Sequence, residues 1–400
     1  MNPKGKVLYL SYDGLTDPLG QAQILPYILG LTSLGFSFQI VSFEKKKAFK
    51  QFECEVNERI KDKSIEWFPL PYTKFPPVLS TVFDLWRMKR TAKKLAKNAN
   101  IIHCRSYLPM LVATSGISVN KLVFDMRGLW ADERVEGHLW PQTNLLYKAI
   151  YSFMRKKEKL FLQQADAIVS LTQDGINALA ERYGQQPFIK KTTVIPCCVD
   201  TKLFNRGNID VDLKISLGLS AEAKVLIHVG SVGTWYRLDQ ELRFFEALKH
   251  ADASWHFLIL TQDRDQAQRI VQEGIHEQVL VLGVPYQEVR LFLGIAHASI
   301  QFIEPSFAKR ASSPVKFGEA LAMGLPVITN QGIGDLYSIM QDKTLGVCIS
   351  NWDEIPEAAA GFDTKAYDAE KIRSFALEQL SLEQGIASYN HVYQTIINHD

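Results

Sequence analysis

Residues 312–330 read SSPVKFGEALAMGLPVITN and predict a short helix followed at once by a buried strand. Ser312 or Ser313 can cap the start of the helix, and Pro314 suits its first turn. Gly324 ends the helix, and the apolar run LPVIT then enters the strand. A helix that leads directly into a buried strand is typical of a sheet whose parallel strands are joined by crossover helices.

The rest of the chain repeats this alternation of short apolar runs and longer helical patterns. We therefore expect an α/β fold with two doubly wound, Rossmann-like parallel sheets that face each other across a cleft, with ligands at the carboxyl ends of the strands. Seven strands are predicted in the first half, at residues 6–12, 38–43, 65–70, 100–105, 121–125, 167–172 and 192–196. Six more are predicted at residues 224–230, 255–261, 278–283, 298–303, 325–330 and 346–350.

The length of the chain indicates two domains, because 400 residues exceed what one hydrophobic core usually spans. The stretch 196–218 lacks clear periodicity and is interpreted as the connection between them. The first domain is predicted to cover residues 1–198 and the second 199–377, with a C-terminal helix at about 378–400 that packs back on the first. A hydrophobic content of 46% excludes a disordered chain.

The cysteines and the apolar segments indicate a cytoplasmic protein. Five cysteines are an odd number, and their positions do not match metal-ligand spacing. The apolar run at residues 7–10 is short and lacks a cleavage site, so a first buried strand is favoured over a signal peptide. Residues 18–43 carry no charge, but the polar residues within them argue against a membrane span.

Two stretches in the second half predict an anion site. Lys316 and Glu319 are three residues apart and share a helix face near a helix N-terminus, where free N–H groups favour a phosphate. Glu319 suits ribose or sugar hydroxyls. The other stretch, GSVGTWYR, follows a strand: Gly230, Ser231 and Gly233 let backbone approach a ligand, and Arg237 can reach a diphosphate. The plainer alternatives are a capped surface helix and a tight turn.

Two stretches in the first half follow strands in the same way. YDGLTDPLGQAQ, residues 12–23, forms a loop that includes Gly20. DMRGLWADERVEGHLW, residues 125–140, gathers many ionisable groups that can supply a general base or an acceptor clamp, unless it is a solvated loop paired with itself. The candidates here are Asp125, Arg127, Asp132 and Glu133, with Trp130 for sugar stacking and His103 lining the same edge, although the histidine and the tryptophan are equally compatible with a structural role.

Three motifs resemble those of family 4 glycosyltransferases (GT4) of the GT-B fold: EALAMGLPVIT, VGSVG after a strand, and VIPCCVDTKLF at the crossover. The resemblance covers nearly the whole chain. Within the family, the sequence resembles a bacterial branch that builds capsule, O-antigen or exopolysaccharide. It implies a retaining enzyme that transfers a sugar from a nucleotide diphosphate, which we expect to be UDP-linked, without a metal or other cofactor. The second domain would hold the donor and the first the acceptor, a saccharide or a lipid-linked oligosaccharide.

The resemblance also assigns residues by position. Glu319 matches the second glutamate of the E-x7-E motif, which contacts the donor ribose, whereas the first glutamate falls at Ala311. Ser312, Ser313 or backbone amides would take over its contacts. Ser231 and Tyr236 occupy the positions where the family usually has an Arg and a Lys. Asp125 and Arg127 occupy the place of the family's histidine after the fifth strand. The predicted catalytic groups are Asp125, Arg127, Glu133, Arg237 and Lys316; the predicted donor ligands are Gly20, Gly230, Ser231, Gly233, Arg237, Ser312, Ser313, Lys316 and Glu319; the predicted acceptor ligands are His103, Trp130, Asp132 and Glu133.

Other functions stay open. The missing first glutamate favours a non-catalytic sugar-nucleotide-binding partner of a transferase complex as the alternative. Asp263 and Asp265 follow a strand and fit a metal-dependent transferase superficially, but two α/β halves contradict a single-domain enzyme. A nicotinamide enzyme would need GxGxxG, which is not present.

The charge is distributed unevenly. The net charge of +2 argues against a nucleic-acid partner, yet residues 85–124 contain no acidic residue. A helix is predicted there whose apolar stripe carries basic residues beside it, which suits an anionic membrane surface unless it is an ordinary solvated helix. We therefore expect peripheral binding to the inner face of the plasma membrane. The stripe comprises Val78, Val82, Leu85, Met88, Ala92 and Leu95, flanked by Arg90, Lys94 and Lys97.

Overall fold

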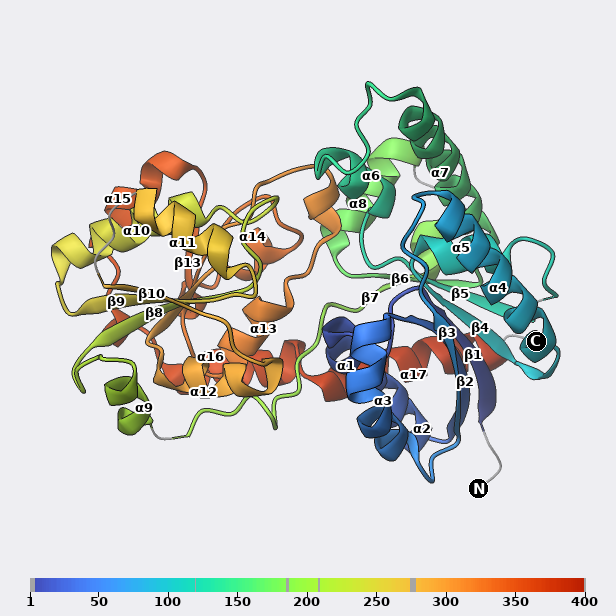
Figure 1. Cartoon of the computed structure of the whole chain (residues 1–400), viewed down its shortest axis with the longest axis horizontal. Coiled ribbons are helices and arrows are strands. Elements are labelled where there is room, and N and C mark those ends of the chain that lie inside the picture. The colour runs from blue at the N-terminus through green and yellow to red at the C-terminus, as the bar shows by residue number, and fades with distance from the viewer. Residues whose placement is uncertain (1–3, 119, 185–186, 208, 274–277, 399–400) are drawn as a thin grey trace. The chain divides into compact units, whose positions relative to one another are not determined.

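The computed structural model describes all residues except 1–3, 119, 185–186, 208, 274–277 and 399–400. The chain divides into two compact units (Figure 1). Unit 1 comprises Met1–Pro196, Arg310–Ser312 and Leu382–Asp400, and unit 2 comprises Cys197–Lys309 and Ser313–Ser381. The first change of unit lies two residues before the expected boundary at 198/199. Three residues of unit 1, 310–312, come from inside the span of unit 2.

Unit 1 is built on a seven-stranded parallel sheet with the order β3-β2-β1-β4-β5-β6-β7. All seven predicted strands are present. The strands are β1 Gly5–Ser11, β2 Phe36–Glu44, β3 Ile65–Pro71, β4 Ile101–Arg105, β5 Lys121–Asp125, β6 Ala167–Ser170 and β7 Thr192–Val194. The helices are α1 Pro18–Gln23, α2 Leu25–Ser33, α3 Lys46–Ile60, α4 Leu79–Leu95, α5 Tyr107–Ala113, α6 Trp130–Glu136, α7 Leu145–Gln164, α8 Gln173–Tyr183 and α17 Leu382–Asn398.

Unit 2 is built on a six-stranded parallel sheet with the order β10-β9-β8-β11-β12-β13, and all six predicted strands are present. The strands are β8 Lys224–Val229, β9 Trp255–Leu260, β10 Val279–Leu282, β11 Ala298–Ile300, β12 Val327–Asn330 and β13 Gly346–Ile349. The helices are α9 Val211–Ser216, α10 Leu238–Ala251, α11 Arg264–Glu273, α12 Val289–Ile295, α13 Val315–Ala322, α14 Leu336–Ile339, α15 Ile355–Ala360 and α16 Ala369–Gln379. Short 3-10 turns occur at Ala96–Asn98, Pro187–Lys191, Tyr286–Glu288, Ala308–Ala311, Lys343–Leu345, Trp352–Glu354 and Thr364–Ala366.

Helices cover both faces of each sheet, which is why the central strands are apolar along their whole length. Along β8, Val225 and Ile227 pack into one core with α12, α13 and α16, while Leu226 packs into a second core with α10 and α15 (Figure 1). This layering confirms the doubly wound α/β fold that the sequence predicts.

The strand order places one switch point in each sheet. It lies between β1 and β4 in unit 1 and between β8 and β11 in unit 2, because the chain reverses its direction across the sheet there. Ligands of doubly wound sheets bind outside the carboxyl ends of the strands at this point. The loops that follow these four strands are therefore the places to examine for a site.

Helix α4 differs from the prediction in the face that it turns to the core. Met88 and Ala92 of the predicted stripe are fully buried, and Val78 precedes the helix. Of the predicted stripe, Val82 is exposed; the other exposed apolar side chains of the helix, Leu79, Phe83 and Trp86, were not part of the prediction. In the part of the chain that the structure describes, no helix has the length and apolar character to cross a membrane.

Candidate functional site

In unit 2, a sharply turned loop follows β8 and leads into α10. We call residues 230–237 the Gly230 loop. Gly233 has φ +86° and Thr234 φ +51°, so the backbone is left-handed at two successive residues. The left-handed φ at Gly233 explains the glycine there, and a Cβ would also force the Gln266 side-chain amide, 2.3 Å away, to move.

Hydrogen bonds hold the Gly230 loop to the neighbouring segments. The Val232 amide donates to Asp263 Oδ2 at 3.1 Å, so the first carboxylate of the Asp263–Asp265 pair supports this loop. The Arg237 amide donates to the Phe302 carbonyl at 2.9 Å, and the Glu304 amide to the Trp235 carbonyl at 2.7 Å. The loop is thereby fixed against the segment after β11, at the switch point of the sheet.

Arg237 stands directly before α10 with its charge already paired. Its guanidinium donates two hydrogen bonds to Asp239, at 2.9 and 2.8 Å, and another to Glu304. These bonds raise the pKa of Arg237 above its ordinary value, and the bond with Arg237 lowers the pKa of Asp239. A ligand phosphate that binds Arg237 therefore competes with these carboxylates for the guanidinium.

Helix α13 carries the second cationic group. Lys316 Nζ lies 2.8 Å from Glu319 Oε2 and 4.7 Å from the centre of the Tyr286 ring. The Tyr286 hydroxyl donates to Glu319 Oε1 at 2.9 Å. Glu319 is completely buried, whereas Lys316 is partly exposed. The predicted pairing of Lys316 and Glu319 on one helix face is confirmed, and Tyr286 joins it from a 3-10 turn distant in the sequence.

The predicted capping of α13 by a serine is wrong. The helix begins after Pro314 without a side-chain cap. Ser313 Oγ instead accepts a hydrogen bond from the Cys197 amide at 3.1 Å, which ties the crossover segment to the residues before α13. The strand after Gly324 is present as predicted, and Gly324 takes φ +70° between the two elements.

Two further groups near the Gly230 loop were missed by sequence reasoning. Lys309 Nζ lies 4.1 Å from the centre of the Trp235 ring and adds a third cation. His228 Nδ1 lies 2.8 Å from Glu241 Oε2, and both side chains are fully buried. Burial lowers the pKa of His228, but the Glu241 carboxylate outweighs burial and raises it overall. No local motif links residues 228 and 241, so the sequence offered no signal for this pair.

The position of the missing glutamate lies in unit 1. Ala311 is 1% exposed. If Gly175 of α8 carried a Cβ, that atom would lie 2.8 Å from the Cβ of Ala311. Arg310 beside it donates to Asp174 at 2.8 Å and to Glu181 at 2.6 Å. The segment 310–312, which includes the predicted donor ligand Ser312, is thus held against α8, and the close packing leaves little room for a glutamate at residue 311.

In unit 1 the loop after β1 is held by Glu44 at the end of β2. The Leu15 and Thr16 amides donate to its carboxylate at 2.8 and 3.1 Å. Gly20 is needed for close packing, because a Cβ there would lie 1.9 Å from the Gly14 carbonyl oxygen. Glu44 was not among the predicted residues, since its partners come from a different strand.

The ends of β4 and β5 bring charged groups together beneath this loop. Asp125 Oδ2 lies 3.4 Å from His103 Nε2 and 3.8 Å from Arg105 Nη1, and Asp125 Oδ1 lies 3.9 Å from Arg127 Nη1. Burial raises the pKa of Asp125, but Arg127, His103 and Arg105 outweigh it and lower the pKa overall. We call these residues, with Tyr389 and Tyr393 of α17, the Asp125 cluster: His103, Arg105, Asp125, Arg127, Tyr389 and Tyr393.

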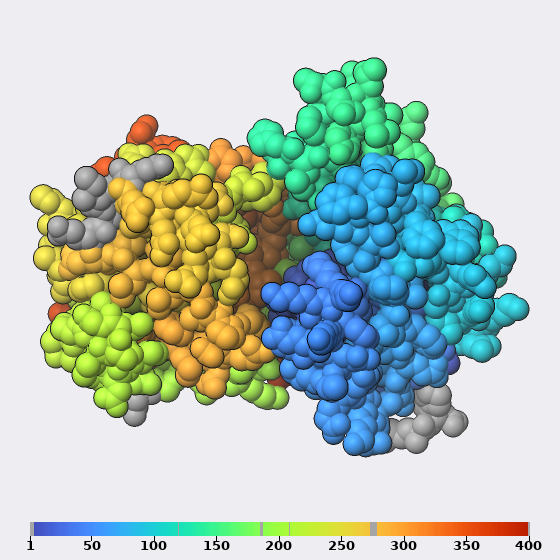
Figure 2. All heavy atoms as spheres, in the orientation of Figure 1, coloured from blue at the N-terminus to red at the C-terminus, as the bar shows by residue number. Residues whose placement is uncertain are grey.

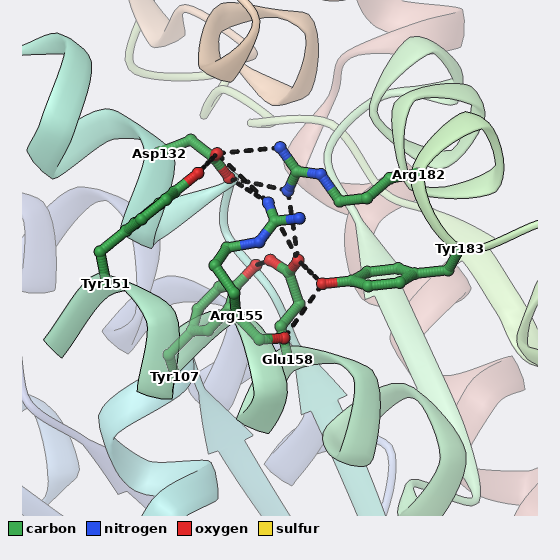
Figure 3. A network of polar contacts seen from close by, with 7 residues as sticks. All are labelled: Tyr107, Asp132, Tyr151, Arg155, Glu158, Arg182 and Tyr183. Carbon is green, nitrogen blue, oxygen red and sulfur yellow. Dashed lines mark hydrogen bonds and ion pairs between the residues drawn. The ribbon is translucent and has the colours of Figure 1, made fainter. Parts of the chain in front are cut away.

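Asp132 belongs to a separate network of residues from α5, α6, α7 and α8 (Figure 3). Arg182 donates to both of its oxygens at 2.8 Å, and Tyr151 donates to Oδ1 at 2.9 Å. Glu158, fully buried, accepts from Tyr107 at 2.6 Å and from Tyr183 at 2.7 Å. The Asp132 carboxylate is therefore occupied by protein donors, and its predicted role as an acceptor ligand requires one of them to leave.

The other predicted acceptor residues lie on α6. The Trp130 ring packs on Tyr107 and meets Trp140 edge-on at 5.2 Å, with Arg134 over its face. Glu133 lies beside Gly128: its Oε1 would be 3.7 Å from a Cβ placed on Gly128. In the described ranges, no three His, Cys, Asp or Glu side chains are grouped so that they could hold a metal ion.

The comparisons with known proteins agree with this architecture. Residues 27–203 match the family described as Glycosyltransferase Family 4, and residues 223–362 match Glycosyl transferases group 1. The structure of HepE from Anabaena in complex with UDP and glucose is similar, with TM-score 0.71 and 15% identity over 98% of this chain and 100% of that one. No curated protein matches the sequence.

Two further solved structures are similar. A glycosyltransferase from Rickettsia africae has TM-score 0.71 and 15% identity over 99% of this chain and 100% of its own. WaaG, a glycosyltransferase involved in lipopolysaccharide biosynthesis, has TM-score 0.67 and 13% identity over 98% of this chain and 100% of its own. Sheet topology and family matches together define a glycosyltransferase of the GT-B fold. Within that class, the chain belongs to the GT4-like family.

Proposed function

We propose that this glycosyltransferase takes its sugar from a UDP-linked donor and transfers it, with retention of anomeric configuration, to a saccharide or lipid-linked acceptor in cell-surface polysaccharide assembly. The observation that carries the proposal is the set of cations at the switch point of unit 2. Arg237 ends the Gly230 loop, Lys309 lies over the ring of Trp235 in the same loop, and Lys316 lies on α13 beside the buried Glu319. HepE was solved with UDP and with UDP-glucose, and WaaG serves lipopolysaccharide biosynthesis, which supports the donor and the pathway.

The proposed chemistry needs positive charge at the leaving diphosphate. The bond between the sugar C1 and the diphosphate oxygen breaks, and a bond from C1 to the acceptor oxygen forms on the same face. The leaving oxygen takes the acceptor proton, so no separate protein base is required. Arg237, Lys316 and the amides of the Gly230 loop stabilise the developing negative charge. These cations supply the charge without a metal, and Glu319 binds the ribose hydroxyls.

The acceptor is assigned to unit 1. Asp125 accepts a hydrogen bond from the acceptor hydroxyl, and Arg127, next to it, keeps Asp125 ionised. Glu133 and Trp130 at the start of α6 would contact the acceptor sugar. These roles follow the proposed division of labour between the two units.

A thermal-shift screen tests the donor. UDP and UDP-glucose should each raise the melting temperature, because a ligand that binds only the folded state stabilises it. GDP and GDP-mannose should raise it less. Equal shifts for both bases would remove the UDP assignment, and no shift with any of the four would contradict a nucleotide-diphosphate donor.

A non-catalytic sugar-nucleotide-binding partner is the second candidate, favoured by the buried Ala311 where the family has a glutamate. It predicts the same thermal shifts but no turnover. The release of UDP from UDP-sugars, measured with a panel of lipid-linked and free saccharides, separates the two. Release that depends on an acceptor supports the enzyme, and shifts without release support the partner.

We also propose that unit 1 docks on an anionic membrane surface through α4 and α7, which both pack against α5. The only acidic residue of each helix, Asp84 and Glu158, is completely buried, so every exposed charge on the two helices is positive. Large apolar side chains stand exposed beside these charges, and Figure 2 shows α4 and α7, blue and green, at the surface of unit 1. They are Leu79, Val82, Phe83 and Trp86 on α4, and Leu145, Leu146 and Phe153 on α7.

A further inference from the structure

A chain of buried polar side chains joins α17 to the ends of β4 and β5 in unit 1. The Tyr393 hydroxyl lies 2.8 Å from His103 Nδ1, and His103 Nε2 faces Asp125 Oδ2 at 3.4 Å. The Tyr389 hydroxyl donates to the same oxygen, Asp125 Oδ2, at 3.0 Å. Helix α17 lies beside α2 (Figure 1). Its two tyrosines form the two ends of the row of side chains Tyr393–His103–Asp125–Tyr389.

Two buried atoms of this network form no hydrogen bond with any residue that the structure describes: His103 Nε2, which only faces Asp125 Oδ2 at 3.4 Å, and Asp125 Oδ1. Buried polar atoms in native proteins are nearly always paired, so an exception calls for an explanation. The backbone around it is also strained: Ser106, next to the end of β4, has φ +71° and ψ −175°, and Arg127 has φ +57°. Strain and an orphaned acceptor together are typical of a ligand site.

The protons of the chain follow from its surroundings. Burial raises the pKa of Tyr393 and of Tyr389 well above the usual value, so both hydroxyls stay protonated and donate. Burial lowers the pKa of His103, so the ring is neutral at pH 7 and its Nδ1 accepts from Tyr393. The single ring proton is then on Nε2, which faces Asp125. Asp125 Oδ2 accepts from Tyr389, whereas Oδ1 accepts from no residue that the structure describes.

Other titratable and charged groups also surround this chain. Tyr9 stacks on the His103 ring at 4.5 Å, and Arg105 lies between Asp125 and Asp13. The groups that surround Asp125 and His103 are Tyr9 on β1, Arg105 on β4, Arg127 after β5, and Tyr389 and Tyr393 on α17. Behind them, Asp13 in the loop after β1 pairs with Arg105, and Tyr27 on α2 packs on Tyr389.

We propose that Tyr389 and Tyr393 are positioning residues: they hold His103 as the neutral Nε2–H form and Asp125 as a carboxylate whose Oδ1 receives the acceptor hydroxyl. The binding of the acceptor hydroxyl at Asp125 Oδ1 rests on the proposed function, whereas the arrangement of the protons does not. The C-terminal helix is thereby part of the acceptor site, although no residue of α17 contacts the acceptor. Removal of either hydroxyl should alter the state of the histidine or the carboxylate without unfolding unit 1.

Nitrogen NMR of protein labelled with ¹⁵N-histidine tests the proton arrangement directly. In the wild type, the His103 signals, assigned with His103→Gln, should be those of a neutral ring protonated on Nε2 between about pH 7 and 8. Tyr393→Phe removes the donor to Nδ1, so the ring should become a mixture of the two neutral forms. A wild-type ring protonated on Nδ1, or spectra that Tyr393→Phe leaves unchanged, would overturn the proposal.

The pH profile of turnover tests the role of Tyr389. Tyr389→Phe removes one donor from the Asp125 carboxylate, so the acid limb of kcat/KM for UDP release should move up by about one pH unit. Tyr107→Phe is the matched control, because Tyr107 is equally buried and also donates to a buried carboxylate, that of Glu158. It should lose stability but keep the wild-type profile.

The outcomes separate this inference from the proposed function. A Tyr389→Phe profile identical to the wild type overturns the positioning role while turnover itself still stands. Equal shifts in Tyr389→Phe and Tyr107→Phe also overturn it, because a general loss of rigidity would then explain both. If the wild type releases no UDP, the proposed function fails, and the NMR result still decides whether the proton arrangement is correct.

Discussion

The cations proposed to bind the diphosphate are paired with carboxylates in the ligand-free protein. Arg237 pairs with Asp239 and Glu304, and Lys316 pairs with Glu319. The Arg237 pairs are partly exposed, and ion pairs of this kind contribute only about 0–1 kcal/mol to stability. The pair of Lys316 differs, because its partner Glu319 is buried. The contribution of the two cations to binding a doubly charged phosphate should be much larger, because the leaving group gains negative charge in the transition state.

Replacement of Arg237 or Lys316 by Ala should therefore lower kcat by about 100-fold. The melting temperature should stay nearly unchanged in Arg237→Ala, whereas Lys316→Ala should lower it, because the buried Glu319 loses its cation. Lys224→Ala is the control, since Lys224 pairs with Asp252 at 2.8 Å, is 31% exposed like Arg237, and starts β8 at the opposite end of the strand from the Gly230 loop. Steady-state rates and thermal unfolding of the three variants provide the measurement. Full turnover in both Arg237→Ala and Lys316→Ala would contradict the assignment.

Local spacing predicted the pair Lys316 and Glu319, because residues three apart share a helix face. It could not predict the partners of Asp125 and His103, since Tyr389 is 264 residues from Asp125 and Tyr393 is 290 residues from His103. The same limit hid Glu44 and the pair of His228 with Glu241. Side chains from distant segments meet only once the sheets have formed.

At the scale of elements, α4 shows what periodicity leaves undecided. The helix has two apolar faces, and the sequence prediction chose the one with Met88 and Ala92, which the core buries. Val82 of that stripe lies on the exposed face, together with Phe83 and Trp86, which the prediction left out. A helical period locates apolar stripes, but which stripe meets the sheet depends on the neighbouring helices.

Docking on lipid predicts that the protein binds vesicles of anionic phospholipid, that binding weakens with salt, and that neutral vesicles retain little of it. Phe83→Ser with Trp86→Ser should weaken binding by removing the inserted side chains. Lys93→Glu, Lys94→Glu and Lys97→Glu together should abolish it by reversing the charge. Vesicle sedimentation at low and physiological salt measures both effects.

The control for this experiment changes the charge by the same amount elsewhere in unit 1. Lys46→Glu, Lys47→Glu and Lys50→Glu reverse three exposed lysines of α3. This variant should bind nearly as well as the wild type. If both triple variants lose binding equally, only the net charge matters and docking through α4 is contradicted. If the wild type does not bind, α4 is an ordinary solvated helix.

At the scale of the whole molecule, all thirteen strands and the doubly wound fold were predictable, because strands covered on both faces appear as short apolar runs. The course of residues 310–312 was not predictable. Those residues join unit 1 through Arg310 and the packing of Ala311 on α8, contacts that no local pattern encodes.

Acid should destabilise the protein from about pH 6.5 downward, partly through His297. Its Nδ1 accepts from the Val225 amide at 3.1 Å, and burial lowers its pKa to about 4. The unfolded chain binds this proton below about pH 6.5 but the folded chain only near pH 4, so unfolding is favoured as the pH falls through that window. The loss is at most about 3 kcal/mol and is reduced by solvent screening.

Chemical denaturation at several pH values between 4 and 7 measures this effect. His297→Gln should flatten the fall in stability relative to the wild type, whereas His250→Gln, at an exposed position, should leave it unchanged. His228 does not alter this window, because its raised pKa means that its contribution is complete below pH 6.5 and is lost only at higher pH. Identical pH dependence in wild type and His297→Gln would contradict the role of His297.

The most direct test of the central claim is a calorimetric titration of the wild-type protein with UDP and with UMP. If Arg237 and Lys316 bind the diphosphate, UDP should bind at least about tenfold more tightly than UMP, because the second phosphate meets these cations. Lys316→Ala should remove most of that difference. Equal affinities for UDP and UMP in the wild type, or no binding of either, would contradict the account.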